Sequence, residues 1–261
     1  MTSPLQLPEP KDVPLRRSPL ALVVCQIRHD RTLAVSDARG ALELQQQLDS
    51  LYPEIEPHQG MSMELRLGQG APQINEEKVS GWKLTSTDSD WTVTLLPEAF
   101  SVETSAYDGW LDFRERLAAL VGAVAGTFGP ALEQRIGLRY VDEIRHPEVT
   151  SAAGWKGWIR NELLGPLAHP DFAPAIRVAQ QVIEFDAGDG HRVTLRHGTS
   201  QVSGEDEWVY LLDHDCFRQA GRPFDQTAIL TSADDLHRVA LRVFESAVTD
   251  DLYSYLDPEA E

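Results

Sequence analysis

The sequence predicts an α+β fold in which helices cover one face of a large, mainly antiparallel sheet. Several short segments alternate apolar and polar residues, which is the period of a half-buried strand. Two long segments carry an apolar stripe at helical spacing. The order strand, helix, three strands, long helix occurs twice along the 261 residues. No residue-level repeat accompanies this order, so the pseudo-duplication is one of element order only.

The elements divide the chain into a lead-in and two halves. Residues 1–17 are expected to form a flexible or extended lead-in, because proline blocks helix and removes backbone donors; the prolines are Pro4, Pro8, Pro10 and Pro14. Residues 18–131 form the first α+β half and residues 132–261 the second. Both halves are expected to pack into a single compact domain.

The first half begins with Leu20–Ile27, a run rich in β-branched residues that is typical of a central strand. A helix follows, which Ser36 or Asp37 can cap and which ends before Pro53. Met61–Leu67 alternates strictly and predicts a strand, whereas residues 68–79 are expected to form a polar loop.

A hairpin follows, in which the strands Trp82–Thr85 and Trp91–Leu95 are joined by short polar residues that favour turns. Phe100 and Val102 extend the sheet. Tyr107–Phe128 predicts a long helix, because its apolar residues fall on one stripe and Gly129 follows its end.

The segment Glu133–Pro147 lies at the middle of the chain, and the rest of the sequence is organised around it. Ile136, Leu138, Tyr140 and Ile144 alternate with charged residues, which predicts a strand with one buried face. This strand begins the second half.

The second half continues with a helix that Ser151 can cap and that Gly165 closes. A hairpin of Val178–Phe185 and Arg192–His197 comes next, and its connection is rich in residues that tolerate positive φ. The remaining elements are the strand Glu207–Asp213 and a long final helix that Thr231 or Ser232 can cap. The two long helices are expected to lie side by side over the sheet, which leaves its other face open.

The acidic composition limits the classes of partner. The chain has 41 acidic and 23 basic residues, for a formal net charge of -18. Such a charge repels phosphate, so nucleic acid and anionic membranes are not expected as partners, whereas a basic protein is.

Cys25 and Cys216 lie in apolar runs and are expected to be buried free thiols. No apolar run is long enough to cross a bilayer, and a cytoplasmic location is expected.

Several motifs together resemble a protein family. They are Tyr107-Asp-Gly-Trp110-Leu-Asp-Phe113, Ile136-Gly-Leu-Arg139-Tyr140-Val-Asp142, Leu211-Leu-Asp213-His-Asp215, Leu236-His237 with Val243-Phe244-Glu245, and the opening Ser18-Pro19-Leu20. The pattern is similar to a sporadically distributed bacterial family of uncharacterised proteins of about this length. It covers roughly residues 18–256, and Asp142 stands where that pattern has an asparagine. The resemblance implies a bacterial cytoplasmic protein and carries over no catalytic or binding residue.

The sequence lacks the motifs that mark the best-known enzyme classes, including phosphate-binding glycine loops, nucleophile elbows and zinc motifs. Asp213 and Asp215 share one face of a strand and could converge on a divalent cation. The alternative is that they pair with arginines on neighbouring strands or cap the following loop.

Two further groups are candidate binding residues. Basic side chains on the open sheet face could hold an anionic ligand; they are Arg66, Lys83, Arg135 and Arg139. Their alternative role is a cross-strand ladder with acidic residues. Trp155 and Trp158 lie three residues apart, and either form part of the core or mark a protein interface.

The leading hypothesis is a non-catalytic cytoplasmic accessory protein that binds a protein partner through its acidic surface or open sheet face. One alternative is a small-molecule-binding protein that holds an anionic ligand over the sheet with Arg135 and Arg139. Another is a metal-assisted hydrolase that uses Asp213 and Asp215 to activate water. Apart from that metal, no cofactor is expected.

Overall fold

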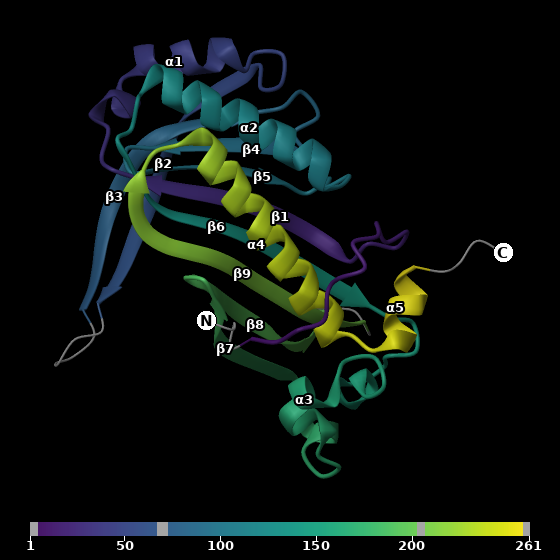
Figure 1. The fold of residues 1–261 in the computed structure, drawn as a ribbon. Coiled ribbons are helices and arrows are strands. Elements are labelled where there is room, and N and C mark those ends of the chain that lie inside the picture. Colours follow the sequence, from purple (N-terminus) through teal and green to yellow (C-terminus); the bar gives the residue numbers. More distant parts are fainter. Residues whose placement is uncertain (1–4, 67–72, 203–206, 258–261) are drawn as a thin grey trace.

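The chain forms an α+β fold built on one continuous antiparallel sheet, so the predicted class is confirmed (Figure 1). This computed structural model describes residues 5–66, 73–202 and 207–257. Within those ranges the sheet has nine strands in the order β2-β3-β4-β5-β1-β6-β9-β8-β7. The strands are β1 (Leu20–His29), β2 (Glu54–Arg66), β3 (Gln73–Thr85), β4 (Trp91–Leu96), β5 (Ala99–Thr104), β6 (Leu132–Arg145), β7 (Val178–Gly188), β8 (His191–Gln201) and β9 (Trp208–Pro223).

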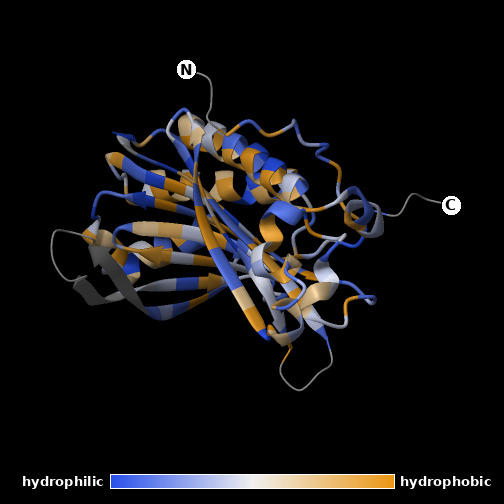
Figure 2. Cartoon of the chain, turned by 90° about the horizontal axis from the view of Figure 1, so that it is seen from below, coloured by the Kyte–Doolittle hydropathy of each residue, from blue (hydrophilic) through white to orange (hydrophobic). Residues whose placement is uncertain are grey.

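The strand β6 lies inside the sheet, between β1 and β9. Its alternation has the predicted sense: Ile136, Leu138, Tyr140 and Ile144 are buried, and Arg139 is exposed. The first strand of the first half, β1, pairs antiparallel with β6, the first strand of the second half. The two halves therefore share one sheet. Figure 2 shows hydrophobic and hydrophilic residues alternating along the strands.

The helices α1 (Ala38–Gln47), α2 (Trp110–Thr127) and α4 (Gln226–Ala247) lie on one face of the sheet (Figure 1). Asp37 caps α1 by accepting a hydrogen bond from the backbone N–H of Arg39, as expected. The apolar stripes of α2 and α4 face the sheet and bury most of their large side chains. The two long helices lie side by side, as predicted. No helix in the described ranges combines the length and the apolar composition that a membrane span requires.

The polar loop predicted for residues 68–79 is wrong from Gln73 onward, because β3 begins there and pairs with β2. In Figure 1 these two strands extend together beyond the helices. Backbone hydrogen bonds between paired strands do not require apolar side chains. This is why the polar residues of the segment do not exclude a strand.

The single helix predicted after Ser151 is divided into short pieces. A 3-10 helix spans Ala152–Trp155, α3 spans Asn161–Leu164, and a second 3-10 helix spans Gly165–Ala168. Between the first two, Gly157 has a φ of 98°, which a right-handed helix does not allow.

The helix α4 begins earlier than predicted, at Gln226 instead of after Thr231 or Ser232. Its N-cap is Asp225, whose side chain accepts a hydrogen bond from the backbone N–H of Ala228. The hydroxyl of Ser232 instead donates to the carbonyl of Ala228 inside the helix, and so does not cap it. A short helix, α5 (Asp250–Leu256), follows α4 and was not predicted.

The N-terminal segment, residues 5–17, crosses α4 near its C-terminal end (Figure 1). The backbone N–H of Lys11 donates to Glu245 Oε1 at 2.8 Å, and Arg242 pairs with Glu9. The backbone N–H of Arg17 donates to the carbonyl of Leu256 at 2.8 Å. The segment forms no helix or strand, with a positive φ of 50° at Asp12 and a turn at residues 16 and 17, and these contacts hold it against the helix layer.

Candidate functional site

The arginines and aspartates predicted for the open sheet face pair with one another. Arg139 donates two hydrogen bonds to Asp213, at 2.6 and 2.8 Å, and Arg135 donates one to Asp215 at 2.7 Å. Arg196 on β8 lies 3.6 Å from Asp213. These contacts join neighbouring strands and form the cross-strand ladder that was the alternative to an anion or metal site.

The other two basic residues of that group are separate from this ladder. Lys83 pairs with Glu56 across β3 and β2, with 3.5 Å between Nζ and Oε1. The side chain of Arg66, at the end of β2, lies outside the described residues. Among the side chains that the structure describes, no group of three or more His, Cys, Asp or Glu is placed to hold a metal ion. Asp213 and Asp215 are instead the acceptors of the arginines.

The two tryptophans lie in the packing of the second half. Trp155 is fully buried, and its Nε1 donates to the hydroxyl of Thr199 at 2.7 Å. Trp158 is half-buried and stacks on His146 with 3.7 Å between ring centroids. The structure therefore supports the role of Trp155 as a core residue, which was the alternative to a protein interface.

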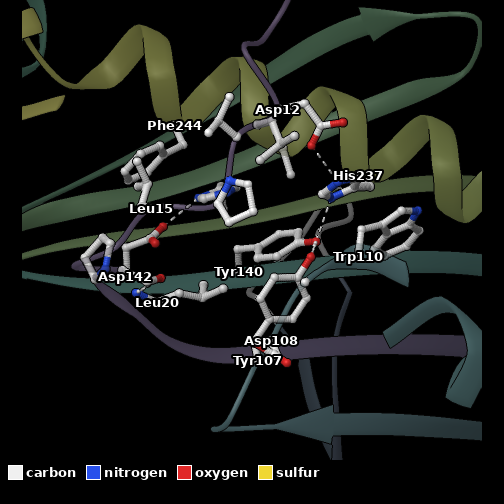
Figure 3. Close-up of a pocket in the computed structure, with 18 residues that line it drawn as sticks. Asp12, Leu15, Leu20, Tyr107, Asp108, Trp110, Tyr140, Asp142, His237 and Phe244 are labelled. Carbon is white, nitrogen blue, oxygen red and sulfur yellow. Dashed lines mark hydrogen bonds and ion pairs between the residues drawn. The ribbon is translucent and has the colours of Figure 1, made fainter. Parts of the chain in front are cut away.

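A different region contains a pocket of about 230 Å³ on the helix side of the sheet (Figure 3). It lies between four parts of the chain: the N-terminal segment with the start of β1, the turn that precedes α2, the strands β6 and β9, and α4. Residues 12–15 and 18–20 contribute one of its walls, residues 107–110 contribute another, and Ala240 and Phe244 contribute to a third. The pocket thus depends on both halves of the chain.

Two buried polar residues lie at the sheet side of this pocket. Asp142 on β6 is 4% exposed and His214 on β9 is 2% exposed. The Oδ2 atom of Asp142 is 3.8 Å from Nδ1 of His214, and neither atom has a hydrogen-bond partner among the described residues. Unpartnered buried polar atoms are rare in folded proteins, so this pair marks the pocket as a candidate site.

Burial sets the protonation of this pair. It raises the pKa of Asp142 to about 8, because the carboxylate is removed from water. It lowers the pKa of His214 to about 4, and the charge of Asp213 opposes this shift only in part. Between pH 4 and pH 8 the pair therefore holds one proton and has no net charge.

A second group of hydrogen-bonded side chains lies beside α4. The hydroxyl of Tyr140 is 2.8 Å from Nδ1 of His237, and the ring of Trp110 stacks on the His237 ring at 4.3 Å. On the other side of His237, Nε2 is 3.7 Å from a carboxylate oxygen of Asp12. Figure 3 shows that the hydroxyl of Tyr107 also points toward Tyr140, 3.5 Å from its hydroxyl.

The salt bridge between the two long helices fixes the position of Trp110. Its Nε1 donates to Asp234 Oδ1 at 2.9 Å, and Arg114 donates to both oxygens of the same carboxylate at 2.7 and 3.0 Å. Because Trp110 stacks on His237, this contact also positions the imidazole toward the pocket.

The aromatic group beside α4 is uncharged near neutral pH. Burial lowers the pKa of His237 to about 4, although Asp12 and Asp234 oppose the shift. Burial raises the pKa of Tyr107 to about 12 and that of Tyr140 well above its usual value. These hydroxyl groups remain protonated and can donate or accept hydrogen bonds.

The expected free thiols are also confirmed, since Cys25 and Cys216 are buried and not bonded to each other. Burial raises the pKa of Cys25 to about 12, so this thiol is not a reactive thiolate.

The sequence interpretation missed this pocket, although one signal was present. Asp142 has the same phase along β6 as Tyr140 and Ile144, so its carboxyl group points to the buried face. The motifs that carry the family resemblance also meet here, although they are far apart in the chain. Their pocket-lining members are Ser18, Pro19, Leu20, Tyr107, Asp108, Gly109, Trp110, Tyr140, Asp142, His214, His237 and Phe244.

A scan against protein-family models and a search of curated proteins both found no match for this chain.

Proposed function

We propose that the protein is a small-molecule-binding protein and that the pocket between β6, β9, α4 and the N-terminal segment is its binding site. One observation carries this proposal: Asp142 Oδ2 and His214 Nδ1 are buried at the pocket without hydrogen-bond partners among the described residues. An unpartnered buried polar atom costs about 1 to 3 kcal/mol. A ligand that supplies the missing hydrogen bonds recovers this free energy, which favours binding.

The arrangement suits binding and orientation of a ligand. Polar groups occupy one side of the pocket, and apolar side chains such as Leu20 and Phe244 occupy another. Small-molecule sites combine apolar walls with a few polar groups that fix orientation. The phenols of Tyr107 and Tyr140 are protonated, so we expect them to form hydrogen bonds instead of acting as nucleophiles.

The open sheet face supports a small-molecule site less well. Arg135 and Arg139 are engaged by Asp215 and Asp213, so an anion would have to compete with carboxylates already at 2.6 to 2.8 Å. The same pairing makes Asp213 and Asp215 weaker candidates for metal ligands, because a metal would leave the arginines unpaired. For these reasons the pocket replaces the sheet face as our candidate site.

A protein partner is the second function that we retain as a proposal, and it rests on the net charge of -18. A surface of this charge attracts basic proteins at long range. The two functions are compatible, because the pocket lies on the helix side of the sheet, which leaves the opposite face with the arginine ladder available to a partner. We further propose a bacterial origin, which rests on the resemblance of the motifs, and a cytoplasmic location, which buried free thiols favour because disulfides are rare in that compartment.

The proposed site can be tested by screening a fragment library by ligand-observed NMR against three forms of the protein. They are the wild type, Ala240→Leu, which fills the pocket from α4, and Ala119→Leu, a control on the exposed face of α2. We expect fragments that bind the wild type and the Ala119→Leu control, and lose binding to Ala240→Leu.

If Ala240→Leu does not fold, Leu20→Phe fills the same pocket from the start of β1. Circular dichroism identifies which variants are folded. Fragments that bind a folded, filled variant as well as the wild type would contradict the proposal, as would the absence of any fragment that binds the wild type.

A further inference from the structure

We propose that the pocket binds an organic cation: a small amine with an apolar body, whose ammonium group lies beside Asp142. This inference rests on the proposed function, because it names the class of ligand that the same pocket takes.

The first argument is the sign of the charges around the pocket. Asp12, Asp108 and Asp142 line it, and among its described lining residues there is no lysine or arginine. Its two histidines, His214 and His237, are uncharged at neutral pH because burial lowers the pKa of each to about 4. An anionic ligand would therefore meet no fixed positive charge, whereas a cation would meet Asp12 and Asp108 and would pair with Asp142 once that carboxyl group, whose pKa is about 8, has lost its proton.

The second argument is the geometry of Asp142 and His214. Their unpartnered atoms are 3.8 Å apart, which is too far for a direct hydrogen bond but close enough for one donor group to reach both. Nδ1 of a neutral His214 accepts a hydrogen bond when the ring proton is on Nε2. An ammonium group has several N–H donors and forms charge-assisted hydrogen bonds to a carboxylate, which are the stronger kind.

The third argument is the apolar wall next to these acceptors. In Figure 3 the side chains of Leu15, Leu20 and Phe244 lie around Asp142. Inorganic divalent cations require several oxygen ligands, which this wall does not offer. An apolar body attached to the ammonium group would bury its surface there. The volume of the pocket also limits the size of the ligand, because about 230 Å³ is smaller than the roughly 300 to 1,000 Å³ of sites for drug-sized ligands.

The net charge of the whole protein also favours a cationic ligand. A formal net charge of -18 gives the surroundings a negative potential, which attracts cations and repels anions before contact. The exposed carboxylate of Asp12 contributes to this potential at the pocket, since its side chain is 70% exposed and lies 3.7 Å from His237.

The test uses three probes of similar shape and different charge: benzylamine, benzyl alcohol and benzoate. Isothermal titration calorimetry at low ionic strength and about pH 8.5, above the pKa of about 8 of Asp142, measures the affinity of each probe for the wild type. The same method measures the three affinities for Asp142→Asn, a substitution that removes the carboxylate with little change in volume. The matched control is Asp189→Asn, at an exposed turn residue with a φ of 52° that asparagine tolerates.

We expect the wild type and Asp189→Asn to bind benzylamine at least tenfold more tightly than benzyl alcohol, and benzoate most weakly. In Asp142→Asn we expect benzylamine to lose at least tenfold in affinity and benzyl alcohol to keep its affinity. Unchanged benzylamine affinity in folded Asp142→Asn, or a preference for benzoate, would overturn the inference.

The outcomes also separate this inference from the proposed function. Benzyl alcohol that binds the wild type and not Ala240→Leu, without any advantage for benzylamine, would leave the pocket as a binding site and reject the cationic ligand. If no probe binds and the fragment screen also finds no pocket ligand, both proposals fail.

Discussion

Asp142 and His214 lie on the neighbouring strands β6 and β9, with 3.8 Å between Oδ2 and Nδ1, and both are almost fully buried. They are diagonal neighbours across the strand pair, because Tyr140 is the residue directly opposite His214. The pair faces the helices, whereas Asp213 and Asp215 on the same strand face the opposite side and meet arginines. The three residues from Asp213 to Asp215 of β9 thus place His214 toward the helices and the two aspartates toward the arginines of the opposite face.

The raised pKa of Asp142 predicts a pH-dependent stability. Its folded pKa of about 8 exceeds the usual aspartate value of 3.8, so its contribution to stability is fully present below pH 4 and is lost as pH rises toward 8. The variant Asp142→Asn has no such group. We therefore expect the free energy of unfolding of Asp142→Asn, relative to wild type, to increase from pH 4 to pH 8 and then level off. Urea denaturation at a series of pH values measures this difference, and a difference that is constant with pH would contradict the burial of an unpaired carboxyl group.

The affinity for an amine should depend on pH in the same range. A protonated Asp142 must lose its proton to pair with an ammonium group, so we expect benzylamine affinity to rise by up to roughly tenfold per pH unit below pH 8. The other titratable groups that face the pocket are Asp12, Tyr107, Asp108, Tyr140, His214 and His237. Calorimetry on Asp142→Asn isolates the contribution of Asp142, and an equal slope in that variant would assign the pH dependence to those other groups.

The hydroxyl of Tyr140 is expected to stabilise the fold through His237. Tyr140→Phe leaves the buried Nδ1 of His237 without its partner at 2.8 Å, and we expect a loss of about 1 to 3 kcal/mol in the free energy of unfolding. The matched control is Tyr255→Phe, at a half-buried tyrosine outside the pocket. Equal stability of Tyr140→Phe and the wild type would indicate that water replaces the hydroxyl.

The arginine ladder is expected to be structural. Arg139→Ala removes both hydrogen bonds to Asp213, whose side chain is 5% exposed, and we expect a loss of about 1 kcal/mol after allowing for the solvent around Arg139. Arg192→Ala breaks an exposed pair with Glu184 and should cost less. Thermal denaturation compares the two, and benzylamine binding should survive in both variants. A folded Arg139→Ala that no longer binds benzylamine would instead support the open sheet face as the binding site.

Much of the fold could be predicted from local patterns. The alternation along β6 identifies its buried side, and the cap at Asp37 identifies the start of α1, because both depend on residues close together in sequence. The errors occurred where local signals compete or are absent. Ser232 resembles a cap but bonds within α4, and Gly157 interrupts a helix that the tryptophan spacing favours.

The pocket could not be predicted in the same way, because its walls come from residues more than a hundred positions apart. His237 and Trp110 stack only because α2 and α4 lie side by side, and Asp234 and Arg114 fix that arrangement. The sequence placed Asp213 on a strand but gave no reason to prefer its neighbour His214 as a pocket residue. Which of two adjacent polar residues faces the helices depends on the phase of β9, and a polar segment has no apolar alternation that reports it.

The measurement that tests the central claim most directly is native mass spectrometry of the protein isolated gently from its own host. We expect the wild type and Asp189→Asn to carry a small adduct whose composition includes a basic nitrogen, and Ala240→Leu to lack it. A bare mass for the wild type, or a co-purifying protein in fixed ratio with no small adduct, would contradict the pocket as the functional site. The second of these results would support the protein-partner proposal instead.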